Sequence, residues 1–233
     1  MAEHPSVKPK PVAAADRIGA KRARAGEPAS RDWWRRVPRV LTAPRPVFAA
    51  LANDDDVDVD ARSEPVLAIT ILVGMAAVIL TPAWGTVMDD STVDGLVLLV
   101  VTFIAGLFYG AAGYFLLGVA LWLGAKAVGV EARFRIARQL VAFAAVPFAL
   151  SLVLVVPTIA LRYGWDWFRT GGEDAGTGRD VVVGIGLAFA AWSLGLVVLG
   201  LRTTFRLPWR GVLGALLLAG VIVAAFAVLP TVL

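Results

Sequence analysis

The first group of residues with the chemistry to bind a ligand is a run of aspartates early in the chain. The run consists of Asp54, Asp55, Asp56, Asp58 and Asp60. A calcium-binding loop begins with similarly spaced acidic residues, but it requires glycine at its sixth position and glutamate at its twelfth. Counted from Asp54, those positions hold Val59 and Pro65. The run therefore fails the calcium pattern. A solvated linker, or an electrostatic partner for the arginines upstream, is favoured over a metal site.

Nucleophilic chemistry has equally little support. Ser151 and Ser193 are the serines within long apolar stretches, and a hydroxyl is a weak nucleophile without an adjacent base. The single histidine, His4, lies in a polar tail, and the chain has no cysteine. Neither the HExxH zinc pattern nor the GxxxxGK[ST] phosphate-binding loop occurs. We therefore predict that the protein is not an enzyme, has no catalytic, cofactor or metal residue, and binds no nucleic acid.

The composition indicates a protein that crosses a membrane several times. Hydrophobic residues make up 58% of the 233 residues and charged residues 17%, whereas a soluble domain has about a quarter charged residues. Five stretches are apolar over a length that suits a helix crossing a hydrocarbon core of about 30 Å. The predicted spans are residues 66–84, 95–125, 139–161, 181–201 and 211–232. The predicted fold class is an all-α polytopic transmembrane bundle of five helices.

The stretch from 95 to 125 is the ambiguous one, because it has 31 uncharged residues and could cross once or twice. Two spans would have roughly 15 residues each, against about 20 needed. A turn within it would also expose unpaired backbone groups to lipid, at several kcal/mol per group. One long helix is therefore expected, although Gly118, Gly124 and Gly129 allow an early or kinked end.

The basic residues give an independent test, because lysine and arginine concentrate in cytoplasmic loops. Twelve of them precede the first span. With a single crossing at 95–125, seven more lie in the two loops on the same side, and only Arg162, Arg169 and Arg179 lie on the other. The expected topology has the N-terminus inside and the C-terminus outside, and the abundance of arginine, alanine, valine and glycine hints at a bacterial inner membrane.

The segment before the first span divides into two parts. Residues 1–30 contain few large apolar side chains, so we expect a disordered cytoplasmic tail. Residues 31–65 are expected to form short interfacial helices and an acidic linker, followed by the membrane domain, 66–233. Aromatic and basic residues here are suited to an anionic inner leaflet. The predicted lipid-interface residues are Trp33, Trp34, Arg35, Arg36 and Arg39. Pro38 is expected to limit the first of these helices, and the alternative is an ordinary basic flank.

Two further sets of residues suggest contacts rather than chemistry. Gly106, Gly110 and Gly113 are small residues at helical spacing, and such faces let helices approach closely in lipid. We favour packing within the chain over a dimer. The basic residues of the two loops are candidates for binding a membrane protein partner. They are Arg133, Arg135, Arg138, Arg202, Arg206 and Arg210. The alternative is that they only fix the orientation.

Four segments carry a resemblance to a known family. They read RRVPRVLTAPRPVFAAL, SEPVLAITILVG, WLGAKAVGVEARFRIARQLVAFAAVPFAL and AWSLGLVVLGLRTTFRLPWRG. Over residues 33–230 the chain resembles the Yip family, membrane proteins first known as interactors of Rab-type small GTPases. The resemblance implies a non-enzymatic protein of membrane organisation, trafficking or assembly.

The favoured function is thus an integral scaffold or complex subunit, possible roles being membrane organisation and lipid trafficking. Its partners would be anionic lipids and a membrane protein. The alternative is a small lipid or solute transporter that acts alone. An ion-coupled carrier would be expected to hold a buried charge in its spans, and the sequence places none there.

Overall fold

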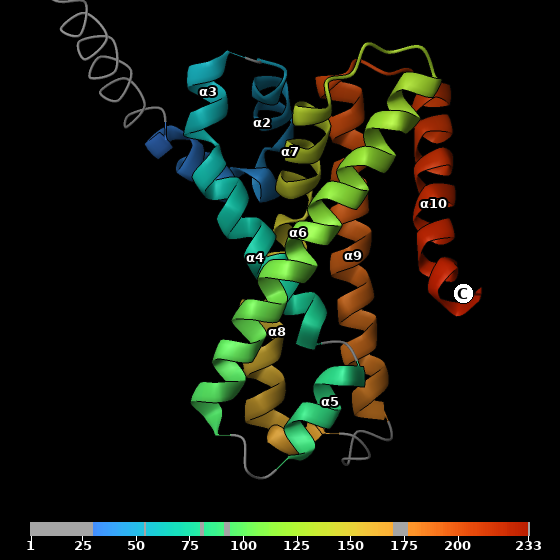
Figure 1. Cartoon of the computed structure of the whole chain (residues 1–233). Coiled ribbons are helices and arrows are strands. Elements are labelled where there is room, and N and C mark those ends of the chain that lie inside the picture. Colours follow the sequence, from blue (N-terminus) through green and yellow to red (C-terminus); the bar gives the residue numbers. More distant parts are fainter. Residues whose placement is uncertain (1–29, 54, 80–81, 91–93, 170–176, 233) are drawn as a thin grey trace, which may run out of the picture.

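The computed structural model describes residues 30–53, 55–79, 82–90, 94–169 and 177–232, and every regular element in these ranges is a helix. An N-terminal helix over residues 30–42 precedes the labelled elements of Figure 1. The labelled helices are α2 (Pro44–Leu51), α3 (Asp56–Ala61), α4 (Ser63–Ile79), α5 (Pro82–Asp89), α6 (Gly95–Ala127), α7 (Phe134–Ala144), α8 (Val146–Tyr163), α9 (Thr177–Thr204) and α10 (Trp209–Val232), with a 3-10 turn, η1 (Trp165–Phe168), after α8. The predicted all-α class is confirmed. The predicted disordered tail lies outside the described residues, except for residue 30.

Four helical stretches are long and apolar enough to cross a membrane. They are Asp56–Ile79, Gly95–Ala127, Phe134–Tyr163 and Asp180–Thr204, and a shorter apolar helix, Trp209–Ala225, follows within α10. The first stretch joins α3 to α4, and the third joins α7 to α8. These elements occur in the order of the five predicted spans. The prediction of a polytopic helical membrane bundle is confirmed.

The ambiguous stretch forms one continuous helix, α6, which has 33 residues and is about 50 Å long. Asp94 caps its first turn, where a carboxylate oxygen accepts the Val97 backbone N–H at 2.8 Å. The helix continues through Gly118 and Gly124 to Ala127. Gly129 follows with a φ of 86°, a left-handed conformation that glycine adopts without strain. Residues 95–125 therefore contain no hairpin, and the early end at Gly118 or Gly124 does not occur.

Two other predicted spans differ from the structure at their ends. The first was expected to reach residue 84, but α4 ends at Ile79 and α5 begins at Pro82. The third span was expected to begin at residue 139, but α7 begins at Phe134 and a break at Ala145 separates it from α8. Arg135 and Arg138 are therefore helical residues and not loop residues.

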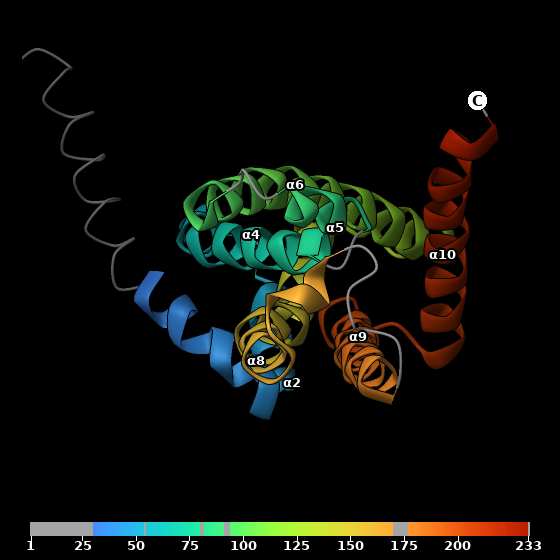
Figure 2. The same cartoon turned by 90° about the horizontal axis from the view of Figure 1, so that it is seen from below.

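The most extensive contact between helices joins α4 to α6. Seen from below, in Figure 2, α4 lies beside α6, α8 lies beside α9, and α10 stands at the edge. A side chain on Gly74 would overlap the Gly106 carbonyl oxygen, and one on Gly110 would overlap the Thr70 carbonyl oxygen. Gly106 and Gly110 thus pack within the chain. Gly113 does not take part, because a Cβ there would meet no atom within 4 Å.

The N-terminal helix and α2 pack against the bundle. A single buried cluster contains residues from both, together with residues of α7 and α9. Its largest fully buried members include Trp33, Phe48, Phe143, Leu140 and Leu201. The apolar side of the segment before the first span is therefore covered by protein.

Replacing Gly110 with alanine should lower the thermal stability of the protein. The added methyl group would overlap the Thr70 carbonyl oxygen, and overpacking of this kind costs about 1–3 kcal/mol. Circular dichroism of the purified protein in detergent would give the melting temperature. Gly113→Ala is the matched control on the same helix and should leave that temperature unchanged. Equal melting temperatures for the two variants would contradict this account of α4 and α6.

Candidate functional site

The predicted basic residues of the two loops lie at one end of the bundle. We call this the basic end, formed by α2, α3, the α6–α7 connection and the α9–α10 connection (Figure 1). Two contacts hold its parts together. Arg135 of α7 pairs with Asp56 of α3 at 3.5 Å, and the Thr204 hydroxyl of α9 donates to the Phe48 carbonyl of α2 at 2.8 Å. Segments far apart in the sequence thus form one surface.

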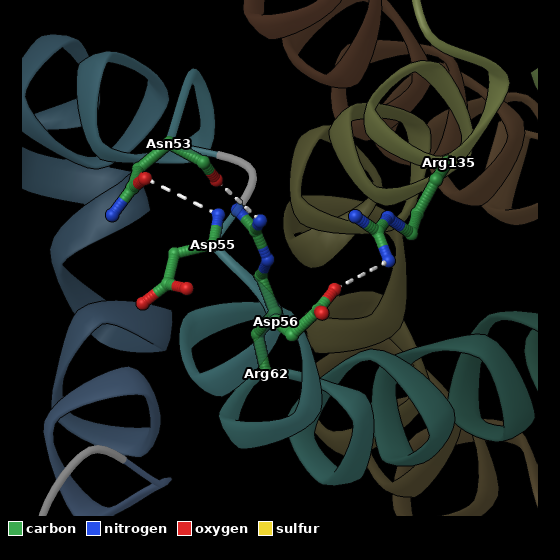
Figure 3. Close-up of polar contacts among 5 residues, drawn as sticks. All are labelled: Asn53, Asp55, Asp56, Arg62 and Arg135. Carbon is green, nitrogen blue, oxygen red and sulfur yellow. Dashed lines mark hydrogen bonds and ion pairs between the residues drawn. The ribbon is translucent and has the colours of Figure 1, made fainter.

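Arg62 organises the N-terminal side of this surface. Its side chain is fully buried and donates to the Leu51 carbonyl at 3.2 Å. It also donates to the Asn53 carbonyl at 2.6 Å (Figure 3). These carbonyls lie at and just beyond the C-terminus of α2, where helix carbonyls lack partners and the helix dipole favours a cation. In the sequence, Arg62 is one of the twelve basic residues before the first span. Its place between the aspartate run and the first span does not identify the carbonyls that it binds.

Trp33 lies inside the protein and not at the lipid interface predicted for it. It is 1% exposed, its ring centroid is 5.5 Å from that of Phe143, and the guanidinium groups of Arg36 and Arg62 lie 4.4 and 5.2 Å from its ring centroid. Trp33 and Val40 share one face of the helix at a spacing of seven residues, and that face meets protein. Pro38 lies within the helix and does not end it.

The other predicted interface residues are more accessible. Trp34 is 43% exposed and its indole N–H donates to Glu64 at 3.4 Å. Arg35 is exposed and pairs with Asp32 at 3.7 Å, and Arg39 is also exposed. Contact of this helix with an anionic leaflet stays a prediction, and Trp34, Arg35 and Arg39 are its available side chains.

The six candidate arginines of the loops fall into three groups. Arg133, Arg202, Arg206 and Arg210 are exposed on the basic end. Arg202 also lies over the Trp209 ring, 4.2 Å from its centroid. Arg135 is engaged with Asp56, whereas Arg138 is half-buried beside aromatic rings of α6 and α7. The exposed group lies at the surface of the basic end.

The aspartate run contributes structure in the part that is described. Asp54 lies outside the described residues. Asn53 connects to its neighbours through a side-chain amide that donates to Asp58 at 2.7 Å and an oxygen that accepts the Asp55 backbone N–H at 3.3 Å. Within the described ranges, no three acidic or histidine side chains are grouped to hold a metal ion. The observed partner of Asp56 is Arg135, which lies downstream and not among the arginines upstream.

Comparison with known families identifies the chain. The family described as the Yip1 domain matches residues 39–229, which is most of the sequence. The chain belongs to the Yip1 domain family. Comparison with curated proteins and with solved structures gave no match. Together with its apolar helices, membership of the Yip1 domain family makes this a multi-pass membrane protein, as the resemblance implied.

Replacing Arg62 with glutamine should destabilise the basic end of this Yip1-domain protein. The shorter amide cannot serve both carbonyls from the same position, and hydrogen bonds to a charged group contribute about 1.5–3 kcal/mol. We expect a lower melting temperature and faster proteolysis between α2 and α4. Arg45→Gln, at an exposed position of α2, is the matched control. Identical cleavage of both variants would show that Arg62 does not hold α2 in place.

Proposed function

We propose that this Yip1-domain protein is a non-enzymatic scaffold that binds a membrane protein partner and anionic lipid at its basic end. The observation that supports this most directly is the convergence of α2, α3 and both basic connections on one surface (Figure 1). Four arginines of that surface, Arg133, Arg202, Arg206 and Arg210, are exposed. A cationic surface of this kind attracts acidic groups of a partner and anionic lipid headgroups.

We also propose that the basic end faces the cytoplasm, with five crossings, the N-terminus inside and the C-terminus outside. The proposal rests on the unequal distribution of basic residues between the two ends. A bacterial inner membrane is the proposed location, supported by the arginine-rich composition alone. A role in lipid trafficking within a complex is compatible with this arrangement.

Single cysteines can test the orientation, since the native chain has none. Cysteines at Asp90 and Asp180, exposed at the opposite end, should react with an impermeant maleimide in spheroplasts of an expression host. Cysteines at Glu131 and Arg210, exposed at the basic end, should react only after the membrane is permeabilised. Labelling of Glu131 in sealed spheroplasts would reverse the proposed orientation.

Charge removal at the basic end tests the scaffold. Affinity purification in mild detergent, with crosslinking and mass spectrometry, should recover a protein partner at near-stoichiometric yield. Combined replacement of Arg133, Arg202 and Arg206 by glutamine should remove the partner, because these exposed cations provide the proposed attraction.

Arg162→Gln is the matched control, because Arg162 is exposed at the opposite end. It should leave recovery of the partner unchanged. Recovery of the chain alone with bulk lipid would contradict the scaffold, and transport of a lipid or solute by the purified protein in liposomes would favour the transporter.

A further inference from the structure

Arg138 occupies a site of a different kind from the other arginines of the basic end. Because α7 begins at Phe134, Arg138 lies one turn inside the helix. Its guanidinium carbon is 5.5 Å from the ring centroid of Tyr114, 5.4 Å from that of Phe115 and 5.5 Å from that of Phe134. Gly118 permits this approach, because a side chain there would come within 2.6 Å of the Arg138 Cβ.

The cation has no counter-ion in the part of the chain that is described. No carboxylate of these residues lies at ion-pair distance from Arg138, and its buried Nε has no hydrogen-bond acceptor among them. Arg135, three residues earlier, has Asp56. Aromatic rings stabilise a guanidinium through their faces, but they accept none of its in-plane N–H groups as an anion does. A partly buried cation is costly unless those donors are paired.

The side of the protein on which this cation lies is apolar. Phe115, whose ring centroid lies 5.4 Å from the guanidinium carbon of Arg138, is 48% exposed. Towards the basic end the cluster continues through Trp122, whose ring centroid lies 5.9 Å from that of Phe134, to Lys126, whose ammonium lies 4.6 Å from the Trp122 ring centroid. Tryptophan and lysine at the end of an apolar helix mark the headgroup level of a membrane. Arg138 thus lies deeper than Lys126, because Gly118, the residue that it meets, comes about two turns before Lys126 on α6.

We propose that Arg138, Tyr114, Phe115 and Phe134 form a binding site for one phospholipid with a net negative headgroup. Arg138 donates to the phosphate oxygens, for which the planar guanidinium is suited. Lys126 lies at the outer edge of the headgroup, and Phe115 contacts the glycerol and upper acyl region. A free phosphate would not cover the apolar side chains around the cation. A phospholipid would pair the cation with its phosphate and cover those side chains with its acyl chains. This inference depends on the membrane location and is independent of the protein partner proposed above.

A photocrosslinker placed in the site tests the proposal. Phe115 is replaced by p-benzoylphenylalanine in the full chain, which is reconstituted in nanodiscs of phosphatidylglycerol and phosphatidylcholine. Phe103 is the matched control, since it is also phenylalanine, lies on α6 and is 48% exposed, with no cation observed over its ring. We expect phosphatidylglycerol to be enriched over its bulk fraction at position 115 by about fivefold, the factor expected from one basic residue near an anionic group. Position 103 should sample lipid in the bulk ratio.

Replacement of Arg138 then tests whether its charge causes the enrichment of phosphatidylglycerol. Arg138→Gln should abolish the enrichment at position 115, whereas Arg162→Gln, at an exposed arginine of the opposite end, should leave it unchanged. Four results would each overturn the proposal. They are labelling of lipids at position 115 in their bulk ratio, crosslinks to protein instead of lipid, displacement of the lipid by inorganic phosphate, and enrichment that persists in folded Arg138→Gln. The comparison of positions 115 and 103 is made with Arg138 present. It therefore tests the proposal even if Arg138→Gln fails to fold. Because Arg138 is not among the residues changed in the partner experiment, loss of the lipid and loss of the partner are separable results.

Discussion

Helices in a hydrocarbon environment gain little from burying apolar surface against one another, because lipid tails are as apolar as leucine side chains. Close contact of backbones therefore determines how this bundle is assembled. The contact of α4 with α6 is close because Gly74, Gly106 and Gly110 leave no side chain between the helices. The backbones of α6 and α10 also approach closely at a glycine, since a side chain on Gly124 would overlap the Ala215 carbonyl oxygen. The long helix α6 is thus fixed on two sides by glycine, and α7 meets it at a further glycine, Gly118.

The N-terminal segment is joined to this bundle by different interactions. Its apolar residues share a buried cluster with α7 and α9, so ordinary hydrophobic burial contributes where the segment would otherwise face water or headgroups. Arg62 sets the position of α2 more specifically, because it binds the carbonyls left unpaired around the end of this helix. The Thr204 hydroxyl adds a second link between α2 and the end of α9. The position of the basic end thus depends on a few polar contacts at helix termini.

The sequence predicted the parts of the fold that depend on length and charge. An uncharged stretch of 31 residues is too short for two crossings, and α6 is accordingly one helix. The predicted start of the third span was wrong, because Arg135 and Arg138 resemble loop residues until their partners, Asp56 and the rings of α6, are known. The prediction for Trp33 was wrong for a related reason. An amphipathic helix shows which face is apolar, but lipid and the interior of a protein both accept that face, and the sequence does not distinguish them. The candidate site was therefore predicted as a set of basic residues, and its division into structural and exposed arginines required the tertiary contacts.

The arginines of the basic end have three kinds of surroundings, which differ in how far the side chain is exposed to solvent. Arg133, Arg202, Arg206 and Arg210 remain exposed, so solvent screens their charge and a partner can displace that solvent. Arg62 is fully buried, and two carbonyl oxygens replace part of its hydration. Arg138 is intermediate, because rings cover its faces while no protein oxygen in the described ranges accepts its Nε–H. An acceptor for its remaining donors must then come from outside these residues. We propose the phosphate of an anionic phospholipid as that acceptor, because the exposed Phe115 beside the cation suits an apolar chain.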